Sequence, residues 1–417
     1  MKFGLRGVRT LLRSLGNPHF RFPSIHVAGT NGKGSTASML AAMFSAAGYK
    51  TGLYTSPHLL DYRERIRING RMIPSGDVVR LSASLKNEIE KNRATFFEAT
   101  TAMAFQFFAD SQVEMAIVET GLGGRLDATN VLRPVTTAIT CVGLEHTDLL
   151  GDTLKKIASE KAGIIKKGIP CVSGVASRQA ENVIRRVCLK QGSVFVSHRA
   201  ARTAIKKSTL ENIVIDVRTP QIELQDLRVS LAGDIQARNV AVALLTLHLA
   251  CSRSSMHVSN DHIRDGLSRI QELSGLQARL SVLKRRPLIL ADTAHNPQAI
   301  SILMKSLTQL GIRKVDLVFG VAKDKDYTSM VRAVRKLVRR VLVVSAKTDR
   351  ALRGGQLEAE FKRNDVPAEL AGTVAQGVKS ALQSADKSIP ILVTGSNFVV
   401  GEALAFLEGR KYLTINQ

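Results

Sequence analysis

A glycine-rich segment near the N-terminus carries the residue types that a phosphate-binding loop needs. It reads AGTNGKGST over residues 28–36, between an apolar run that predicts a strand and a stretch that predicts a helix. Glycines let backbone N–H groups turn toward phosphate oxygens, and a helix N-terminus adds partial positive charge. The sequence pattern differs from the common P-loop motif, because Gly34 separates Lys33 from Ser35. We predict a phosphate site in which Lys33 reaches the β- and γ-phosphates and Ser35 or Thr36 serves a metal or phosphate.

An acid and an imidazole follow two further predicted strands. Glu119 lies near the end of EMAIVETG (114–121), and His146 lies just beyond TTAITCVG (136–143). Ligands of open α/β sheets gather at the carboxyl ends of the strands, so we expect both side chains at the edge that holds the phosphate loop. A carboxylate there suits a metal bound to nucleotide phosphates. The alternatives are a carboxylate that only caps a turn and an ordinary structural histidine.

Weaker polar signals occur at other strand ends. Ser56, in YTSPHLLDYRERI, offers an oxygen to Mg²⁺, although that string alone is better explained as an ordinary turn. Asp127 adds a polar group to the glycine-containing loop after Glu119, and Lys161 lies on a predicted helix, where a lysine is usually a surface residue. In the second half, Asp292 ends PLILAD, a place where an acid can hold ribose hydroxyls.

Short β-branched runs alternate with helical stretches through all 417 residues, which indicates βαβ units and mainly parallel sheets. In the first half, strands are predicted at 24–29, 50–56, 114–121 and 136–143, and helices at 34–48, 97–110, 152–163, 234–251 and 260–270. Asp152 is expected to cap the helix over 152–163. Short polar-alternating strands over about 195–230, FVSHRA among them, predict a small antiparallel sheet inserted in or appended to the first domain.

A second α/β series follows. Its predicted strands are PLILAD, KVDLVFG, RVLVVS and IPILVTG, and its predicted helices include 297–310, 326–338 and 396–408. We therefore expect two domains, 1–275 and 276–417, with a cleft between two functional edges.

The bulk composition indicates a globular protein of the cytoplasm. Apolar residues make up 44% and charged residues 23% of the chain, and no apolar run approaches the ~18 residues of a membrane span. The formal net charge is +24, but aromatic residues are only 5% and Trp is absent, so stacking sites for nucleic acid are not predicted. We expect a basic surface that steers anionic substrates, with VRKLVRR (334–340) on a solvated helical face. The scattered cysteines, with no C-x-x-C pair, are expected to be buried thiols.

Together these strings resemble the Mur ligase superfamily of ATP-dependent amide ligases, and within it the folylpolyglutamate and dihydrofolate synthases. The motifs AGTNGKGST, YTSPHLLDYRERI, TFFEATT, ETGLGGRLDATN, EHTDLLG with SEKAG, and DTAHNP occur in the order and spacing of that family over nearly the whole chain. The resemblance implies an N-terminal P-loop domain, a C-terminal Rossmann-like domain, and ATP between them. It also implies that ATP converts a carboxylate into an acyl phosphate, which the amine of L-glutamate attacks.

The resemblance further implies a role for each matched residue. ATP would be bound by Gly32, Lys33, Gly34, Ser35, Asn239, Arg279, Asp292 and His295. Two Mg²⁺ ions are expected, with Ser56, Glu119 and His146 as ligands. Lys161 would be the lysine that is carbamylated in the family and acts as a carboxylate toward the second metal, and with Lys33 and His146 it forms the expected catalytic set. Thr95 and Asp127 would lie on the pterin side of the substrate pocket.

Two departures from the family pattern stand out. Gly4-Leu5-Arg6-Gly7-Val8 replaces a G-L-E-R-[VI] string, and Glu145 replaces the more usual Asp before His146, a change from which we expect little effect. The predicted protein is a monomer that binds ATP, L-glutamate and dihydropteroate or a reduced folate, without nucleic acid or membrane as partner. Two alternatives stay open: a Mur-type ligase that acts on a peptidoglycan precursor, and a non-catalytic P-loop protein that binds nucleic acid.

Overall fold

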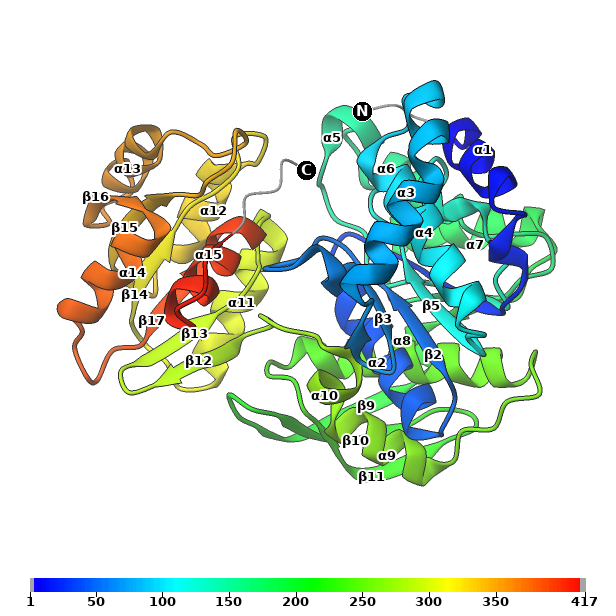
Figure 1. The fold of residues 1–417 in the computed structure, drawn as a ribbon. Helices are drawn as coiled ribbons and strands as arrows, with labels where there is room; N and C mark the ends of the chain where they lie inside the picture. Colours follow the sequence, from blue (N-terminus) through cyan, green and yellow to red (C-terminus); the bar gives the residue numbers. More distant parts are fainter. Residues whose placement is uncertain (1–3, 413–417) are drawn as a thin grey trace.

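The computed structural model describes residues 4–412 and has two lobes, each built on its own sheet (Figure 1). The strands of the first lobe are β1 (Ser24–Ala28), β2 (Thr51–Tyr54), β3 (Ile66–Ile68), β4 (Arg71–Met72), β5 (Met115–Glu119), β6 (Thr136–Ile139), β7 (Cys171–Ser173), β8 (Phe195–Ser197), β9 (Arg202–Ser208), β10 (Ile213–Arg218) and β11 (Glu223–Val229). Its helices are α1 (Arg6–Ser14), α2 (Lys33–Ala46), α3 (Ser75–Asn92), α4 (Phe96–Asp110), α5 (Thr147–Leu150), α6 (Leu154–Ala162), α7 (Arg178–Lys190), α8 (Ile235–Cys251), α9 (Asn260–Ser268) and α10 (Ile270–Ser274).

The large sheet of this lobe has the order β4-β3-β2-β5-β1-β6-β7-β8. In this order, the neighbouring strands β2, β5, β1, β6, β7 and β8 pair in parallel. Strands β3 and β4 pair antiparallel at one edge of the sheet. Parallel pairing brings the carboxyl ends of β1, β2, β5 and β6 to one edge of the sheet, where the polar residues identified above follow. The predicted mainly parallel sheet is therefore confirmed.

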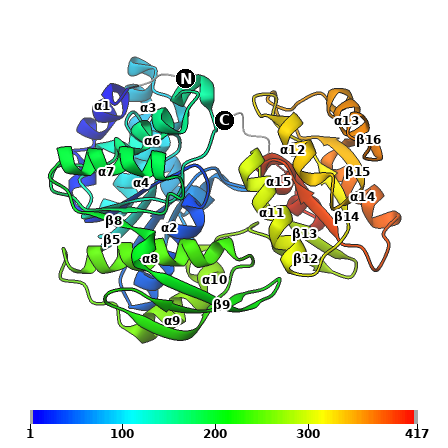
Figure 2. The ribbon, with the colours of Figure 1, turned by 180° about the vertical axis from the view of Figure 1, so that it is seen from behind.

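A separate antiparallel sheet, β11-β10-β9, confirms the predicted insertion. The assignment of FVSHRA to it was wrong, because its strand β8 pairs in parallel with β7 in the large sheet. The side chains of β8 are half-exposed, as expected of an edge strand, so its pattern does not identify its partner. Seen from behind, α8 lies between the large and the small sheet and contacts both (Figure 2).

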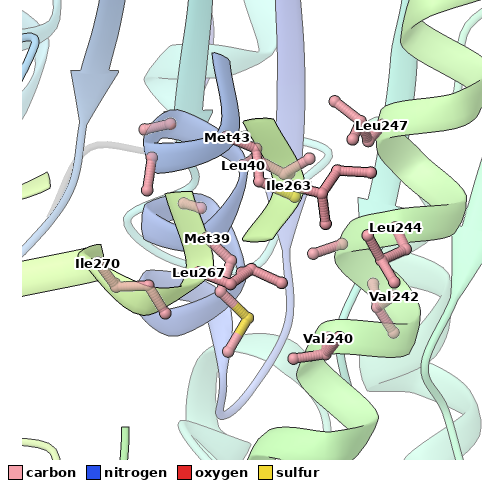
Figure 3. Close-up of a cluster of buried hydrophobic side chains, with 14 of the residues drawn as sticks. Met39, Leu40, Met43, Val240, Val242, Leu244, Leu247, Ile263, Leu267 and Ile270 are labelled. Atoms are coloured by element: carbon pink, nitrogen blue, oxygen red, sulfur yellow. The ribbon is translucent and has the colours of Figure 1, made fainter. Parts of the chain in front are cut away.

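Helix α2 is apolar on nearly all sides and is buried accordingly. Its residues Met39, Leu40 and Met43 meet side chains from α8, α9 and α10 (Figure 3). Strand β5 contributes to two of the core clusters of the lobe: Met115 and Ile117 belong to the α2 side, and Ala116 and Val118 to the side of α1, α3 and α4. Each fully buried Leu or Met contributes roughly 1.5–3 kcal/mol to folding, so these layers fix the strand ends that carry the site.

The second lobe contains the sheet β12-β13-β17-β14-β15-β16, parallel except for β12 at its edge. Its strands are β12 (Ser281–Arg285), β13 (Leu288–Ala291), β14 (Val315–Phe319), β15 (Val338–Ser345), β16 (Ala368–Thr373) and β17 (Ile391–Thr394). Its helices are α11 (Pro297–Gln309), α12 (Tyr327–Val334), α13 (Gly354–Arg363), α14 (Val374–Gln383) and α15 (Asn397–Leu407). The predicted Rossmann-like series is confirmed, although β12 and β16 were not predicted.

The basic run VRKLVRR does not form one solvated helical face. Helix α12 ends at Val334, and Arg339 and Arg340 lie on β15. Asp316, on the neighbouring strand β14, is 1% exposed and accepts hydrogen bonds from Nε of Arg339 at 2.8 Å and Nε of Arg340 at 3.0 Å. The predicted helix over 326–338 was therefore too long, because a buried acid elsewhere in the chain draws the two arginines into a strand.

The segment after β2 joins the lobes. It extends from the first lobe toward α15 (Figure 1), and Leu59 packs in a core cluster with Val399, Val400 and Ala403 of α15. Gly401 leaves room for it, because a Cβ atom there would collide with the carbonyl oxygen of Leu59. None of the helices within residues 4–412 has the length and apolar character of a membrane span.

Candidate active site

The phosphate loop connects the end of β1 to the first turn of α2. Gly32 is the N-cap of α2 with a φ of 81°, a left-handed conformation that favours glycine. A Cβ atom at Gly32 would also lie 2.8 Å from Oδ1 of Asn239, whose amide nitrogen donates to Gln236. The structure thus brings Asn239, from α8, against the loop that carries Lys33.

The first turn of α2 offers polar groups that need a partner. The first N–H groups of a helix have no partner inside the helix. Ser35 and Thr36 are buried, and no described residue forms a hydrogen bond with Oγ1 of Thr36. A buried hydroxyl without a partner is uncommon. This group, beside free N–H groups and the Lys33 ammonium, fits an oxyanion such as a phosphate.

Glu119 emerges from the end of β5 beside this loop. Its Oε1 lies 3.9 Å from Nζ of Lys33, and its Oε2 accepts a hydrogen bond from the backbone N–H of Ser56 at 3.3 Å. The residue is 4% exposed. Burial raises the pKa of Glu119, and Lys33, the Ser56 amide and Arg279 oppose that rise. Ser56, Glu119 and Lys33 are therefore neighbours, as their motifs led us to expect.

Gly34, the residue at which the loop departs from the common P-loop motif, faces the second lobe. A Cβ atom there would lie 3.3 Å from a guanidinium nitrogen of Arg279 and 3.7 Å from Oε2 of Glu119. Gly34, Ser56, Glu119 and Arg279 all line one pocket, which takes its walls from both lobes. The unusual glycine thus lets a cation of the second half of the chain approach the phosphate loop.

Asp292 connects the segment before β12, which carries Arg279, to the loop after β13, which carries His295. Its Oδ2 accepts from the backbone N–H of Leu280, and its Oδ1 from that of Ala294, both at 2.8 Å. Burial raises the pKa of Asp292, and Arg279 is the first of the groups that oppose this rise. Arg279 itself donates to Oγ1 of Thr293. Asp292 therefore lies in the predicted region, with its carboxylate bound by one backbone amide of its own loop and one of the segment before β12.

His146 begins α5 with a φ of 50°, at the carboxyl edge of β6. Its Nε2 lies 3.3 Å from Nζ of Lys325, and because an ammonium can only donate, Nε2 is the acceptor. Burial and then Lys325 lower the pKa of His146 to about 4, which keeps the ring neutral near pH 7. The structure therefore places His146 against a cation of the second lobe. Within residues 4–412, no three side chains of His, Cys, Asp or Glu come together as a metal site by themselves.

Lys161 lies on α6 and is 3% exposed, unlike a typical helix lysine. Burial, and then the nearby charge of Lys33, lower the pKa of Lys161 to about 7. Helix α6 is capped by Thr153, whose Oγ1 accepts from the N–H of Lys156, so the predicted Asp152 cap was wrong by one residue. A threonine hydroxyl competes well for the N-cap, and Asp152 instead pairs with Lys156 on the surface.

Thr95 and Asp127 serve as helix caps. Thr95 is the N-cap of α4 in a reciprocal pair with Glu98, and Asp127 caps the short 3₁₀ helix η3 (Ala128–Val131). Oδ2 of Asp127 accepts from the N–H of Leu122 at 2.8 Å, and Oδ1 from the N–H of Thr129 at 3.0 Å. Burial raises the pKa of Asp127, and those bonds oppose the rise. The structure therefore gives both residues a local role in shaping loops near β5.

Sequence reasoning missed the polar contacts between the lobes. Glu145, from which little effect was expected, accepts from Nε2 of His295 at 3.0 Å and from Nζ of Lys325 at 3.1 Å. Asn31 of the phosphate loop bonds to Asn296 of the second lobe. The signal for Lys325 was its place in VFGVAKDKDY, a strand-to-loop junction. Nothing in the local sequence pairs that junction with Glu145.

Comparisons with known proteins give a consistent result. The model of the Mur ligase middle domain matches residues 27–247, and that of the Mur ligase glutamate ligase domain matches residues 278–397. The chain is 34% identical to the folylpolyglutamate synthase of Lacticaseibacillus casei, covering 97% of this chain and 95% of the relative. It is 34% identical to the dihydrofolate synthase/folylpolyglutamate synthase of Bacillus subtilis, covering 84% and 83%. Escherichia coli FolC in complex with DHPP and ADP matches with a TM-score of 0.88 at 28% identity, covering 98% and 94%.

Proposed function

The chain belongs to the Mur ligase family, in the group of the folylpolyglutamate and dihydrofolate synthases, and we propose that it joins L-glutamate to dihydropteroate, to tetrahydrofolate (poly)glutamates, or to both, with conversion of ATP to ADP and phosphate. One observation supports this most strongly. The buried Glu119 carboxylate and the Arg279 guanidinium line one pocket between the lobes, and the Lys33 ammonium of the phosphate loop lies 3.9 Å from Glu119. The Mur-type peptidoglycan ligase is set aside because the curated relatives described above are named for folate substrates.

The reaction needs positive charge where phosphate charge gathers. A substrate carboxylate oxygen attacks the γ-phosphorus of ATP, the bond to ADP breaks, and an acyl phosphate forms. The amine of L-glutamate then attacks the carbonyl carbon and loses a proton, and phosphate leaves with the electron pair of the C–O bond. Arg279, which lines the pocket, and Lys33, which lies 3.9 Å from the pocket residue Glu119, would stabilise both charged states.

The residues at the sheet edge fit Mg²⁺. Glu119 supplies a buried carboxylate and Ser56 a hydroxyl, and Mg²⁺ usually adds waters and substrate phosphates to so few protein ligands. When bound, the ion would neutralise phosphate charge. His146 has a neutral ring but its Nε2 already accepts from Lys325, so it would join the set by releasing that contact.

Lys161 has the chemistry that carbamylation requires. A neutral amine attacks CO₂, and the carbamate forms with loss of one proton. The pKa of about 7 makes much of the Lys161 amine neutral near pH 7, whereas an ordinary lysine is almost wholly charged. The carbamate would carry negative charge toward Lys33, whose charge now disfavours the ammonium. We propose that Lys161 is carbamylated and holds a second Mg²⁺.

The activity is tested by ADP release from purified protein with Mg-ATP and L-glutamate. Dihydropteroate and tetrahydrofolate are supplied in separate assays. We expect glutamate-dependent release with at least one of them. The proposal is wrong if neither substrate gives it. A Glu119→Gln variant should lose most of this activity, whereas Glu114→Gln, at an exposed position just before the same strand, should retain it.

Carbamylation is tested on Lys161→Ala. The variant should be inactive and should regain part of its activity with short-chain carboxylates, and Lys155→Ala, at an exposed position of the same helix, should be fully active. Wild-type protein in ¹³C-bicarbonate should show a carbamate carbon signal by NMR that Lys161→Ala lacks. Full activity of Lys161→Ala would exclude this role.

Four further proposals accompany the activity. The domain bounds are 1–275 and 276–417, which the change of sheet between α10 and β12 supports. The protein is a monomer of the cytoplasm, which sedimentation and fractionation would test. Thr95 and Asp127 shape the pterin side of the pocket through the loops that they cap.

A further inference from the structure

The two lobes meet at a polar junction beside the phosphate loop. The first lobe contributes Asn31, two residues before Lys33, and Glu145. The second lobe contributes Asn296, at the start of α11, and Lys325. None of these four residues was predicted to act in the site, yet they connect the loops that would hold the two ends of a nucleotide.

The side-chain amides of Asn31 and Asn296 form a reciprocal pair across the boundary. Nδ2 of Asn296 donates to Oδ1 of Asn31 at 2.9 Å, and Nδ2 of Asn31 donates to Oδ1 of Asn296 at 3.3 Å. Asn31 also donates to Oε1 of Gln298 at 3.1 Å. Gly143 makes room there, because a Cβ atom at that position would collide with the Gln298 side chain. Such pairing fixes two groups at once and is more specific than a single contact.

Glu145 is the second anchor of this junction. Its Oε1 accepts from Nε2 of His295 at 3.0 Å, from Nζ of Lys325 at 3.1 Å and from Nδ2 of Asn296 at 3.3 Å. The Glu145 and Lys325 side chains are only 9% and 10% exposed. A buried carboxylate depends on all its donors, because losing one leaves charge without compensation. Glu145 therefore holds His295, Asn296 and Lys325 in one arrangement against the first lobe.

We propose that Asn31, Asn296 and Glu145 are positioning residues that hold the DTAHNP loop of the second lobe on the phosphate loop, so that the two halves of the nucleotide site stay assembled. The proposal rests on the proposed function only in placing the nucleotide between the lobes. A nucleotide that needs both lobes binds more weakly when the assembled state is less populated, in proportion to the loss of that population. Removing the amide pair should therefore weaken nucleotide binding although Lys33, Arg279 and Asp292 stay in place.

The dual role of Asn296 allows a sharp test. Its Oδ1 also accepts from the N–H of Ala299 as the N-cap of α11. Serine is an equally good N-cap but is too short to carry the amide contacts, so Asn296→Ser should keep the helix and lose the junction. Thr373→Ser is the matched control, because it replaces the N-cap of α14 in the same lobe by another good cap.

The experiment measures ADP affinity by calorimetry for wild type, Asn31→Ala, Asn296→Ser, the double variant and Thr373→Ser, with no folate or glutamate present. We expect each junction variant to bind ADP about five- to tenfold more weakly, and the double variant to lose less affinity than the two single losses combined, because both changes break the same Asn31–Asn296 pair. Thr373→Ser should bind like wild type. Unchanged affinity, or losses that add in full in the double variant, would overturn the proposal. A ligase assay that fails for lack of the right substrate does not affect this result.

Small-angle X-ray scattering gives a second measurement. Without ADP, Asn31→Ala and Asn296→Ser should have a larger radius of gyration than wild type, because the lobes separate more often. Saturating ADP should reduce that difference. A radius equal to that of wild type in both variants without ADP would contradict the positioning role even if ADP binding were weaker.

Discussion

Nζ of Lys33 lies 3.9 Å from Oε1 of Glu119, and each side chain reduces the cost of burying the other. Lys33 comes from the start of α2 and Glu119 from the end of β5, so β1 and β5, which pair in parallel, determine this distance. The pair holds a cation and a metal-binding group side by side at the place where phosphate would enter.

Replacing Lys33 should therefore lower activity by weakening the stabilisation of the transition state. We expect Lys33→Met to lower kcat/KM by about 10²–10³-fold, because a preorganised donor to the charged transition state is lost. Lys155→Met, which removes an exposed lysine of the first lobe, should have no effect. Steady-state ADP release measures both. A Lys33→Met enzyme with wild-type kcat/KM would show that the loop does not hold the transferred phosphate.

Lys161 should lower stability in a way that depends on pH. Its pKa in the folded chain is about 7, below the ordinary value of 10.5, so between these values the unfolded chain binds a proton that the folded chain does not. The cost of the buried charge is therefore complete below pH 7 and declines as the pH rises toward 10.5. We expect Lys161→Met to raise the free energy of unfolding by a few kcal/mol at pH 6 and by less at pH 9.

Urea unfolding in CO₂-free buffer measures this difference, because a carbamate would mask it. Lys155→Met serves again as the control and should shift neither value. A Lys161→Met variant that is stabilised equally at both pH values would mean that the amine is not neutralised by folding.

The two arginines that bind Asp316 should support the second lobe. Removing both, in Arg339→Met/Arg340→Met, leaves a carboxylate that is 1% exposed without its charged donors. Because the arginines themselves are partly exposed, we expect a loss on the order of 3 kcal/mol. Urea unfolding should show it, and Arg335→Met, at an exposed position of the same run, should unfold like wild type. Equal stability of the double variant and Arg335→Met would contradict this assignment.

The helix that carries Lys161 offers a fourth prediction. Thr153→Ala should destabilise the protein by about 1 kcal/mol, since the N-cap bond to Lys156 is lost. Asp152→Ala should have no measurable effect, because its pair with Lys156 is largely exposed. Thermal unfolding of both variants distinguishes the two caps. A larger loss in Asp152→Ala would restore the aspartate as the cap.

The sequence was most informative where a residue's role is local. Gly32 and Lys33 follow the buried strand β1, Glu119 ends the buried strand β5, and the parallel pairing of these strands brings the residues together. It failed where the decisive partner is distant in the chain. The strand identity of Arg339 depends on Asp316, the pairing of β8 depends on β7, and the role of Glu145 depends on Lys325 about 180 residues away.

Periodicity also failed to distinguish neighbouring caps, since both Asp152 and Thr153 are good N-cap residues and only the backbone shows which one precedes the first helical turn. Lys161 illustrates a further limit. Nothing in SEKAG shows that the lysine points inward, because burial is decided by the packing of α6 against α7 and the β5 loop.

Leu59 limits how the second lobe can be exchanged between related chains. It belongs to the first lobe by sequence and to the interior of the second by packing, against Val399, Val400 and Ala403. In a chimera that takes its second lobe from a relative, the packing site for residue 59 would be shaped for the side chain that the relative has at that position. An exchange of lobes that cuts the chain only at the linker between Ser274 and Ser281 would therefore separate Leu59 from the residues that it packs against. Residue 59 and the α15 residues that it contacts must come from the same parent chain.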